Sequence, residues 1–167
     1  MDYLTLLVKA KEIANYMIDH KFKYNNKGVK NSWSDAKKAK ITNCSSGVSY
    51  CLQEMGVLKS TQRIWGNVND SITYHGVGTK SRILKYYEVI KIGKRPKDCV
   101  DSLRAGDICF YNNHTNIFAG VNKDHEMIFW DFGSASTDTK SEGGTFCNIH
   151  RAENPKKKIT YIMRFKD

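Results

Sequence analysis

The chain has 167 residues, of which 40% are hydrophobic and 26% charged, as is ordinary for one globular domain with a sizeable core. No apolar run approaches the roughly 20 residues that a membrane span needs, so we expect no transmembrane segment. The 27 Lys and Arg residues outnumber the 17 Asp and Glu residues, and the resulting net charge of +10 favours an anionic partner.

The cysteines argue against a metal site and against a disulfide framework. They are odd in number and contain no CxxC pair, with positions 44, 51, 99, 109 and 147. Structural zinc sites need such paired spacing, so we expect neither a metal nor another cofactor. The N-terminus has no basic region or cleavage site of a signal peptide, which favours synthesis in the cytoplasm with free thiols.

Residues 1–42 are predicted to form an N-terminal region of helix and loop, followed by a further helix. Residues 3–20 carry apolar side chains at helical spacing, and after a polar segment a short helix is expected to open at Trp33, capped by Ser32 or Ser34. Residues 43–57 predict another amphipathic helix, with Val48, Leu52 and Met55 on one face and Gly56 as the stop signal.

The rest of the chain is predicted to form mainly strands. Residues 58–80 show no sustained period, which indicates a loop that could build a substrate groove. A helix running into a strand is expected over 82–92, followed by strands at 107–111, 114–121, 126–132 and 159–165, with a hairpin turn at 122–125. Helices first and an antiparallel sheet over 103–165 predict a single α+β domain spanning 1–167.

Three residues form a candidate catalytic set. Cys44 lies at the start of the helix 43–57, where the helix dipole and unpaired N–H groups favour the nucleophilic thiolate. His114 begins an apolar strand directly after an Asn pair, and Asp131 is the only carboxylate in an aromatic strand. A helix-borne Cys followed by a strand-borne His is the order of a papain-like cysteine hydrolase.

Each of the three residues also has a structural alternative. Cys44 could be an ordinary buried thiol, as we expect for Cys51 and Cys109, and His114 could be a polar residue at a strand edge. Asp131 could cap a turn before Gly133. Their occurrence together, on helix, strand and strand, favours catalysis.

Several motifs resemble the NlpC-type cell-wall cysteine peptidases. Residues 43–48 are similar to that family's nucleophile motif, 103–111 to its Gly-Asp strand, 114–120 to its histidine strand, and 129–134 to a segment of its phage-borne members. The resemblance covers roughly residues 20–165. It implies a papain-like fold, with N-terminal helices packed on a central antiparallel sheet, and cleavage of amide bonds in peptidoglycan by Cys44, His114 and Asp131.

The resemblance also bears on substrate binding and on the biological setting. A tyrosine upstream of the nucleophile often helps to bind the oxyanion in this family, and Tyr24 stands at a suitable distance. Trp65 and His75 are further candidates for substrate contact. Asn43 stands where the family usually has Asp, and Asp131 where many members have His or Asn.

We expect a monomeric, endolysin-like bacteriolytic enzyme that acts on the wall after release, or as a module of a larger phage or secreted protein.

Rival functions remain open from the sequence. The same three residues would serve an endopeptidase acting on stem or cross-bridge peptides, or an N-acetylmuramoyl-L-alanine amidase, because specificity would lie in the segments 58–80 and 133–148. An acyltransferase or lipid hydrolase would need an apolar groove or a membrane-facing helix, and the sequence indicates neither.

A non-catalytic nucleic-acid-binding protein would interleave arginine with aromatic residues, whereas lysine dominates here, so no nucleic acid is expected. The expected partner is peptidoglycan, with teichoic acids contacted through lysine clusters such as 37–40 and 156–158. Alternatively, scattered lysines only keep the protein soluble.

Overall fold

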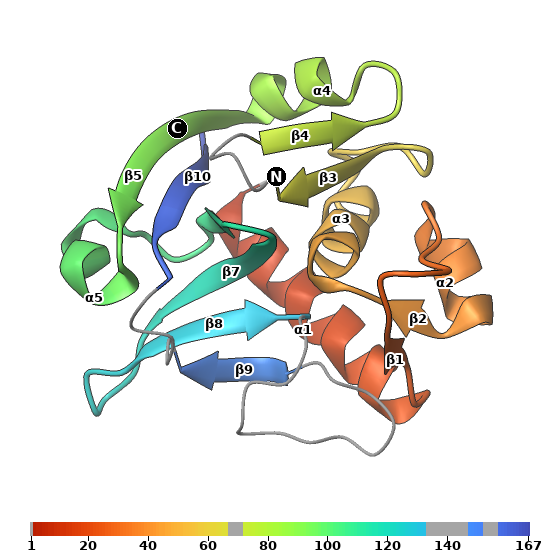
Figure 1. The fold of residues 1–167 in the computed structure, drawn as a ribbon, viewed down its shortest axis with the longest axis horizontal. Helices are drawn as coiled ribbons and strands as arrows, with labels where there is room; N and C mark the ends of the chain where they lie inside the picture. The colour runs from red at the N-terminus through yellow and green to blue at the C-terminus, as the bar shows by residue number, and fades with distance from the viewer. Residues whose placement is uncertain (1, 67–71, 133–146, 152–156) are drawn as a thin grey trace.

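The structure is a computed structural model that describes residues 2–66, 72–132, 147–151 and 157–167 (Figure 1). Its helices are α1 (Tyr3–Asp19), α2 (Trp33–Ala39), α3 (Cys44–Glu54), α4 (Thr79–Tyr86), α5 (Pro96–Cys99) and the 3-10 turn η1 (Val100–Ser102). Its strands are β1 (Lys23–Tyr24), β2 (Ile41–Thr42), β3 (Arg63–Gly66), β4 (Ile72–His75), β5 (Tyr87–Lys94), β6 (Ile108–Tyr111), β7 (His114–Val121), β8 (Met127–Asp131), β9 (Cys147–Arg151) and β10 (Ile159–Phe165).

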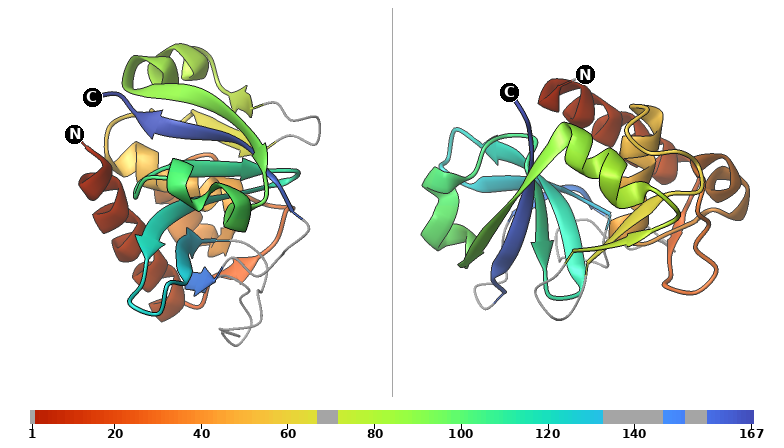
Figure 2. Two further views of the ribbon diagram at one scale, coloured as in Figure 1. Left: turned by 90° about the vertical axis from the view of Figure 1, so that its left-hand side faces the viewer. Right: turned by 90° about the horizontal axis from the view of Figure 1, so that it is seen from above.

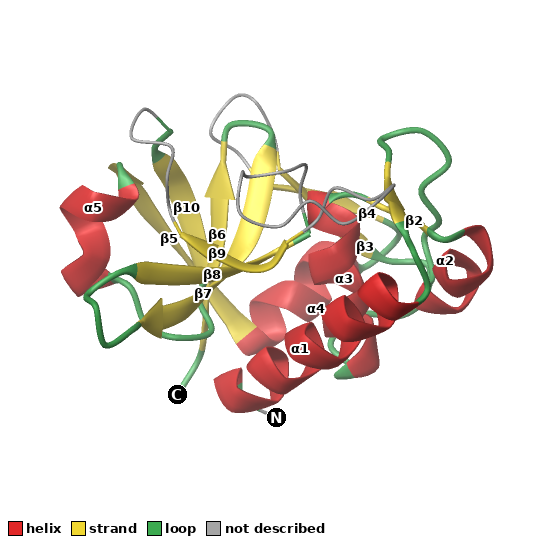
Figure 3. Ribbon diagram, turned by 90° about the horizontal axis from the view of Figure 1, so that it is seen from below, coloured by secondary structure: helices red, strands yellow, loops and turns green. Residues whose placement is uncertain are grey.

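A six-stranded antiparallel sheet forms one half of the molecule, and the long helices form the other. The strand order is β5-β10-β6-β7-β8-β9, while β1 and β2 make a short parallel pair and β3 and β4 a separate hairpin. Helices α1 and α3 lie beside the sheet, and α2 with β1 and β2 lies beyond them (Figures 1 and 3). The view from above in Figure 2 separates the two halves. The fold is therefore α+β.

Two apolar clusters hold these layers together. The larger cluster joins α1 and α3 to the sheet and contains Leu6, Met17, Leu52, Phe110, Ile117 and Phe132. The smaller cluster lies under α5 and contains Cys99, Cys109, Phe118, Phe129 and Ile162. Burial of this apolar surface is the main favourable contribution to folding. Cys51 and Cys109 are fully buried, as expected for core thiols.

Most of the predicted elements are confirmed. Helix α1 matches the prediction for 3–20, α2 begins at Trp33 with Ser32 as its N-cap, and α3 begins at Cys44. The strands β6, β7, β8 and β10 and the helix-to-strand passage from α4 to β5 also lie where they were expected. The 122–125 turn closes with a hydrogen bond from the Asn122 N–H to the Glu126 carbonyl (2.9 Å).

Two expectations about the chain are wrong, and one strand was missed. The segment 58–80 is not a loop throughout, because β3 and β4 pair as an antiparallel hairpin within it. The sheet does not begin at residue 103, since β5 pairs with β10 at its edge. Strand β9, which pairs with β8, was not predicted. The segment 133–146, to which specificity was partly assigned, lies outside the described residues.

One close contact brings α3 against the sheet. A Cβ atom added at Gly47 would lie 2.4 Å from the Cβ atom of Phe132 and 2.2 Å from its ring, which is far inside any normal contact distance. Only glycine therefore allows the first turn of α3 to approach the end of β8, where Asp131 lies.

Candidate active site

The first turn of α3 presents Cys44 with a well-formed cap behind it. The Asn43 side chain accepts a hydrogen bond from the Ser46 N–H (2.9 Å), and the Ser46 hydroxyl accepts one from the Asn43 N–H (2.8 Å). The helical ladder begins only at Gly47, whose N–H donates to the Asn43 carbonyl (3.0 Å). The N–H group of Cys44 therefore precedes the ladder, at the positive end of the helix dipole.

His114 is the first residue of β7 and follows a tight two-residue turn. Asn113 in that turn has a φ of 63°, a backbone conformation that asparagine tolerates better than most residues. The His114 Nε2 atom lies 2.8 Å from Oδ2 of Asp131, the last residue of β8. Because Nε2 is engaged with this carboxylate, Nδ1 is the ring nitrogen left to exchange a proton with Cys44.

The electrostatic environment shifts the pKa values of Cys44 and His114 in opposite directions. Burial raises the pKa of the Cys44 thiol, but hydrogen bonds from the His114 ring and the Thr115 backbone, together with the His114 charge, lower it overall. Burial lowers the pKa of His114, but the charge and hydrogen bond of Asp131 and the bond to Cys44 raise it to about 10. This arrangement favours a thiolate paired with an imidazolium at neutral pH.

The structure adds Asn116 to the three residues expected from the sequence. Side chains two positions apart on a strand point to the same face, so Asn116 faces Asp131 as His114 does. The Asn116 Nδ2 group donates to the same Asp131 Oδ2 atom (3.2 Å), and the Asn116 side chain is buried. The carboxylate oxygen thus accepts hydrogen bonds from two neighbouring side chains of β7.

Tyr24 lies close to this group, on β1. Its hydroxyl donates to Oδ1 of Asn26 (3.4 Å), and the same oxygen accepts a hydrogen bond from Nδ2 of Asn43 (3.3 Å). Burial raises the pKa of the Tyr24 hydroxyl, and the charges of Cys44 and Asp131 raise it further. Tyr24 therefore stays protonated, and its single O–H can donate to a substrate atom once it turns away from Asn26.

Trp65 and His75 lie together on the β3–β4 hairpin. Their ring centroids are 5.8 Å apart, and the Trp65 side chain is 41% exposed, which leaves it available for contact with a ligand. Beneath Trp65 lies the buried guanidinium of Arg63, whose central carbon is 4.9 Å from the Trp65 ring centroid. Burial lowers the pKa of Arg63, while the nearby Tyr50 and Cys44 raise it, so this buried cation lies within electrostatic range of the nucleophile.

Sequence reasoning missed Asn116 and Arg63 for different reasons. An asparagine two residues after the candidate histidine carried a usable signal, because side chains at that spacing share a strand face. Arg63 carried none, since its burial depends on the β3–β4 pairing and on packing against α3. The remaining described cysteines are buried, and burial leaves the pKa of Cys51, Cys99 and Cys109 raised overall, whereas His114 lowers that of Cys44 overall.

Within residues 2–66, 72–132, 147–151 and 157–167, no group of three or more His, Cys, Asp or Glu side chains is arranged to hold a metal ion. In the same part of the chain, no helix is long and apolar enough to cross a membrane.

The chain was compared with known proteins in three ways. No family model, no curated protein and no solved structure matches it.

Proposed function

We propose that this protein is a cysteine hydrolase that cleaves amide bonds in bacterial peptidoglycan. The observation that carries the proposal is the placement of Cys44 at the start of α3, hydrogen-bonded to a histidine whose Nε2 atom is 2.8 Å from Asp131. A nucleophile, an acid–base group and an orienting carboxylate in this order supply what acyl transfer through a thioester requires.

The proposed reaction has two steps. In the first, the Cys44 sulfur attacks the carbonyl carbon, the C–N bond breaks, and the imidazolium of His114 gives its Nδ1 proton to the leaving amine. In the second, neutral His114 takes a proton from water, hydroxide displaces the sulfur from the thioester, and the acid leaves. The Cys44 N–H and the Tyr24 hydroxyl are the donors we assign to the oxyanion.

The choice of substrate rests on the motifs and on the fold class. The helix-borne cysteine motif at 43–48 and the histidine strand at 114–120 resemble those of NlpC-type peptidases. An α+β fold with its helices first and an antiparallel sheet after them is compatible with the papain-like fold of that family. We propose endopeptidase activity on stem or cross-bridge peptides, with Trp65 and His75 as substrate contacts.

Digestion of purified sacculi tests the proposal. Mass analysis of the released fragments should show shortened or uncrosslinked peptides, and Cys44→Ala should release none. Cys51→Ala is the matched control, because it removes a buried thiol from the same helix without touching the site. Release of intact stem peptides freed from the glycan would instead assign the amidase reaction, and fragment release by Cys44→Ala would overturn the proposal.

A further inference from the structure

Residues 21–40 form a strongly basic segment, here called the basic lobe. It contains seven lysines and one carboxylate, Asp35, and so holds +6 of the chain's net charge of +10, which leaves +4 for the other 147 residues. Residues 78–97 carry the same net charge of +6, from seven Lys and Arg residues and Glu88, so the basic lobe differs from them by its place beside α3 and not by its charge. The lysines of the basic lobe are Lys21, Lys23, Lys27, Lys30, Lys37, Lys38 and Lys40.

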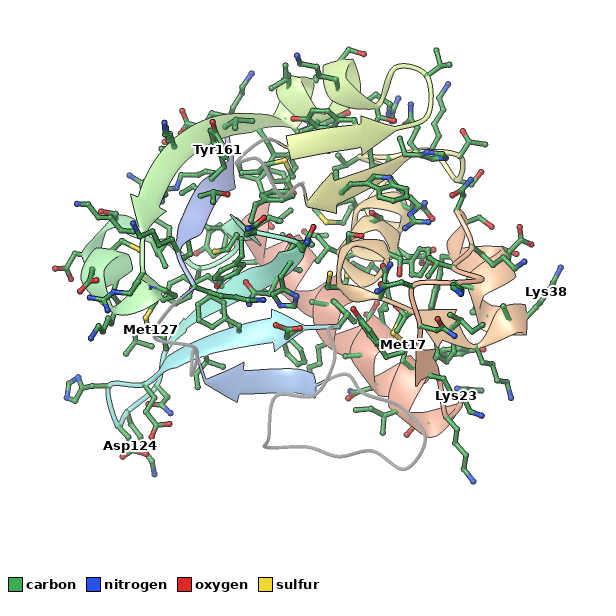
Figure 4. The ribbon with its side chains drawn as sticks, viewed as in Figure 1. Met17, Lys23, Lys38, Asp124, Met127 and Tyr161 are labelled. Carbon is green, nitrogen blue, oxygen red and sulfur yellow. The ribbon has the colours of Figure 1, made fainter. Side chains whose placement is uncertain are left out.

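All seven lysine side chains are exposed to solvent. Among the described residues, none of the seven forms an ion pair with a carboxylate. Lys30 and Lys38 line one open hollow of about 390 Å³, together with Asp35 and Ala39. Figure 4 shows Lys23 and Lys38 projecting outward from the end of the molecule that α2 occupies. Their positive charge is thus available to a partner.

The basic lobe is joined directly to the start of α3. Strand β1 pairs in parallel with β2, which ends one residue before the N-cap Asn43. The side-chain hydrogen bond between Asn26 and Asn43 (3.3 Å) ties the same loop to the cap. A polymer held on the lobe would therefore lie next to the nucleophile.

We infer that the basic lobe binds a phosphodiester-linked anionic polymer of the cell wall and so holds the substrate wall at the active site. The inference rests on the proposed function. The lobe contains no arginine, Phe22 and Trp33 are buried, and Tyr24 is half-buried, so the lobe offers no exposed aromatic ring on which bases could stack. Lysines act as point charges for phosphate groups, which suits a flexible polymer better than a nucleic acid.

Co-sedimentation with sacculi tests the inference in the Cys44→Ala background, where binding is separated from hydrolysis. The test variant carries Lys23→Gln, Lys30→Gln and Lys38→Gln. The control variant removes the same charge from the opposite side of the molecule, through substitution of the exposed Lys91, Lys94 and Lys97 by Gln. Sacculi are used both intact and after hydrofluoric acid has removed their phosphate polymers.

On intact sacculi, the test variant should bind about tenfold more weakly at 0.1 M salt, with the slope of log K against log salt reduced by about 2. The control variant should bind nearly as the parent does, and the stripped sacculi should abolish the difference. Equal weakening of binding by the test and control variants would overturn the inference. So would parent protein that binds stripped sacculi as tightly as intact sacculi, or that binds a DNA oligonucleotide more tightly than intact sacculi. Hydrolysis of a soluble peptide fragment by the lysine variants with Cys44 intact tests the proposed function separately.

Discussion

Cys44 and His114 form one chemical unit, because each group shifts the pKa of the other toward the charged form. We expect His114→Ala to lower turnover by roughly 10²–10⁴-fold, and the double variant with Cys44→Ala to be no worse than Cys44→Ala alone. Rates of wall lysis measure both effects.

The control for this prediction is His125→Asn. His125 lies in the β7–β8 turn at a φ of 61°, which asparagine tolerates, so this substitution removes an imidazole without straining the backbone. Loss of activity in His125→Asn equal to that in His114→Ala would show that the wrong histidine has been assigned.

The raised pKa of His114 predicts how the protein responds to pH. In the folded state this pKa is about 10, above the roughly 6.5 of a free histidine. The stabilisation from protonated His114 is therefore complete below about 6.5 and is lost as the pH rises through about 10. Activity should likewise persist into the alkaline range and fall near pH 10.

Initial rates between pH 5 and 11, with thermal unfolding followed at each pH, measure this dependence. Asp131→Asn should move the alkaline limb to lower pH, because it removes the charge that raises the His114 pKa. An alkaline limb near pH 7 in the unsubstituted protein would contradict the assigned ion pair.

Asn116 is expected to act as a positioning residue for Asp131. Asn116→Ala removes one donor to Oδ2, so the carboxylate is held less firmly against His114. We expect kcat to fall about tenfold, as for the loss of one hydrogen bond, with little change in KM. The alkaline limb of the pH profile should also move to lower pH. A reduced melting temperature with unchanged kcat and pH profile would mean that Asn116 is only structural.

At the level of secondary structure elements, the contact between Gly47 and Phe132 sets the position of the nucleophile. Gly47→Ala should destabilise the protein by about 1–3 kcal/mol and lower activity, because the added methyl group forces α3 away from β8. Chemical denaturation measures the stability. In a Phe132→Ala background the same substitution should cost much less, and an equal cost in both backgrounds would contradict the contact.

The helices and strands that the sequence predicted correctly are those that local sequence patterns specify. Helix α3 was marked by its apolar face and by Gly56, which adopts a φ of 75° at the helix end. Strands β3 and β4 are only four residues each and lack a clear alternation, so their pairing depends on packing against α3. The parallel pair β1–β2 is shorter still, with two residues in each strand.

The candidate site was predictable to the extent that residue chemistry marked it. A cysteine at a helix start, a histidine at a strand start and a lone carboxylate in an aromatic strand are visible in the sequence. The amide of Asn116 and the buried charge of Arg63 acquire their place only from strand pairing and burial.

For the molecule as a whole, composition predicted the sign of the charge but not its location. The sequence shows that residues 21–40 are rich in lysine, but the pairing of β1 with β2 places this lobe beside the start of α3. The separation of helices from the sheet similarly follows from the order of elements along the chain, since each layer must bury one apolar face against the other. The active site lies where these layers meet.

The most direct test of the account is the reaction of the protein with iodoacetamide at pH 6, where an ordinary thiol of pKa about 8.5 is almost entirely protonated. Mass analysis should find one rapid adduct, on Cys44, formed in step with the loss of wall lysis. His114→Ala should slow this adduct to the rate of an ordinary thiol. Rapid labelling of another cysteine, or full lytic activity in the protein alkylated at Cys44, would contradict the assignment of Cys44 as the nucleophile.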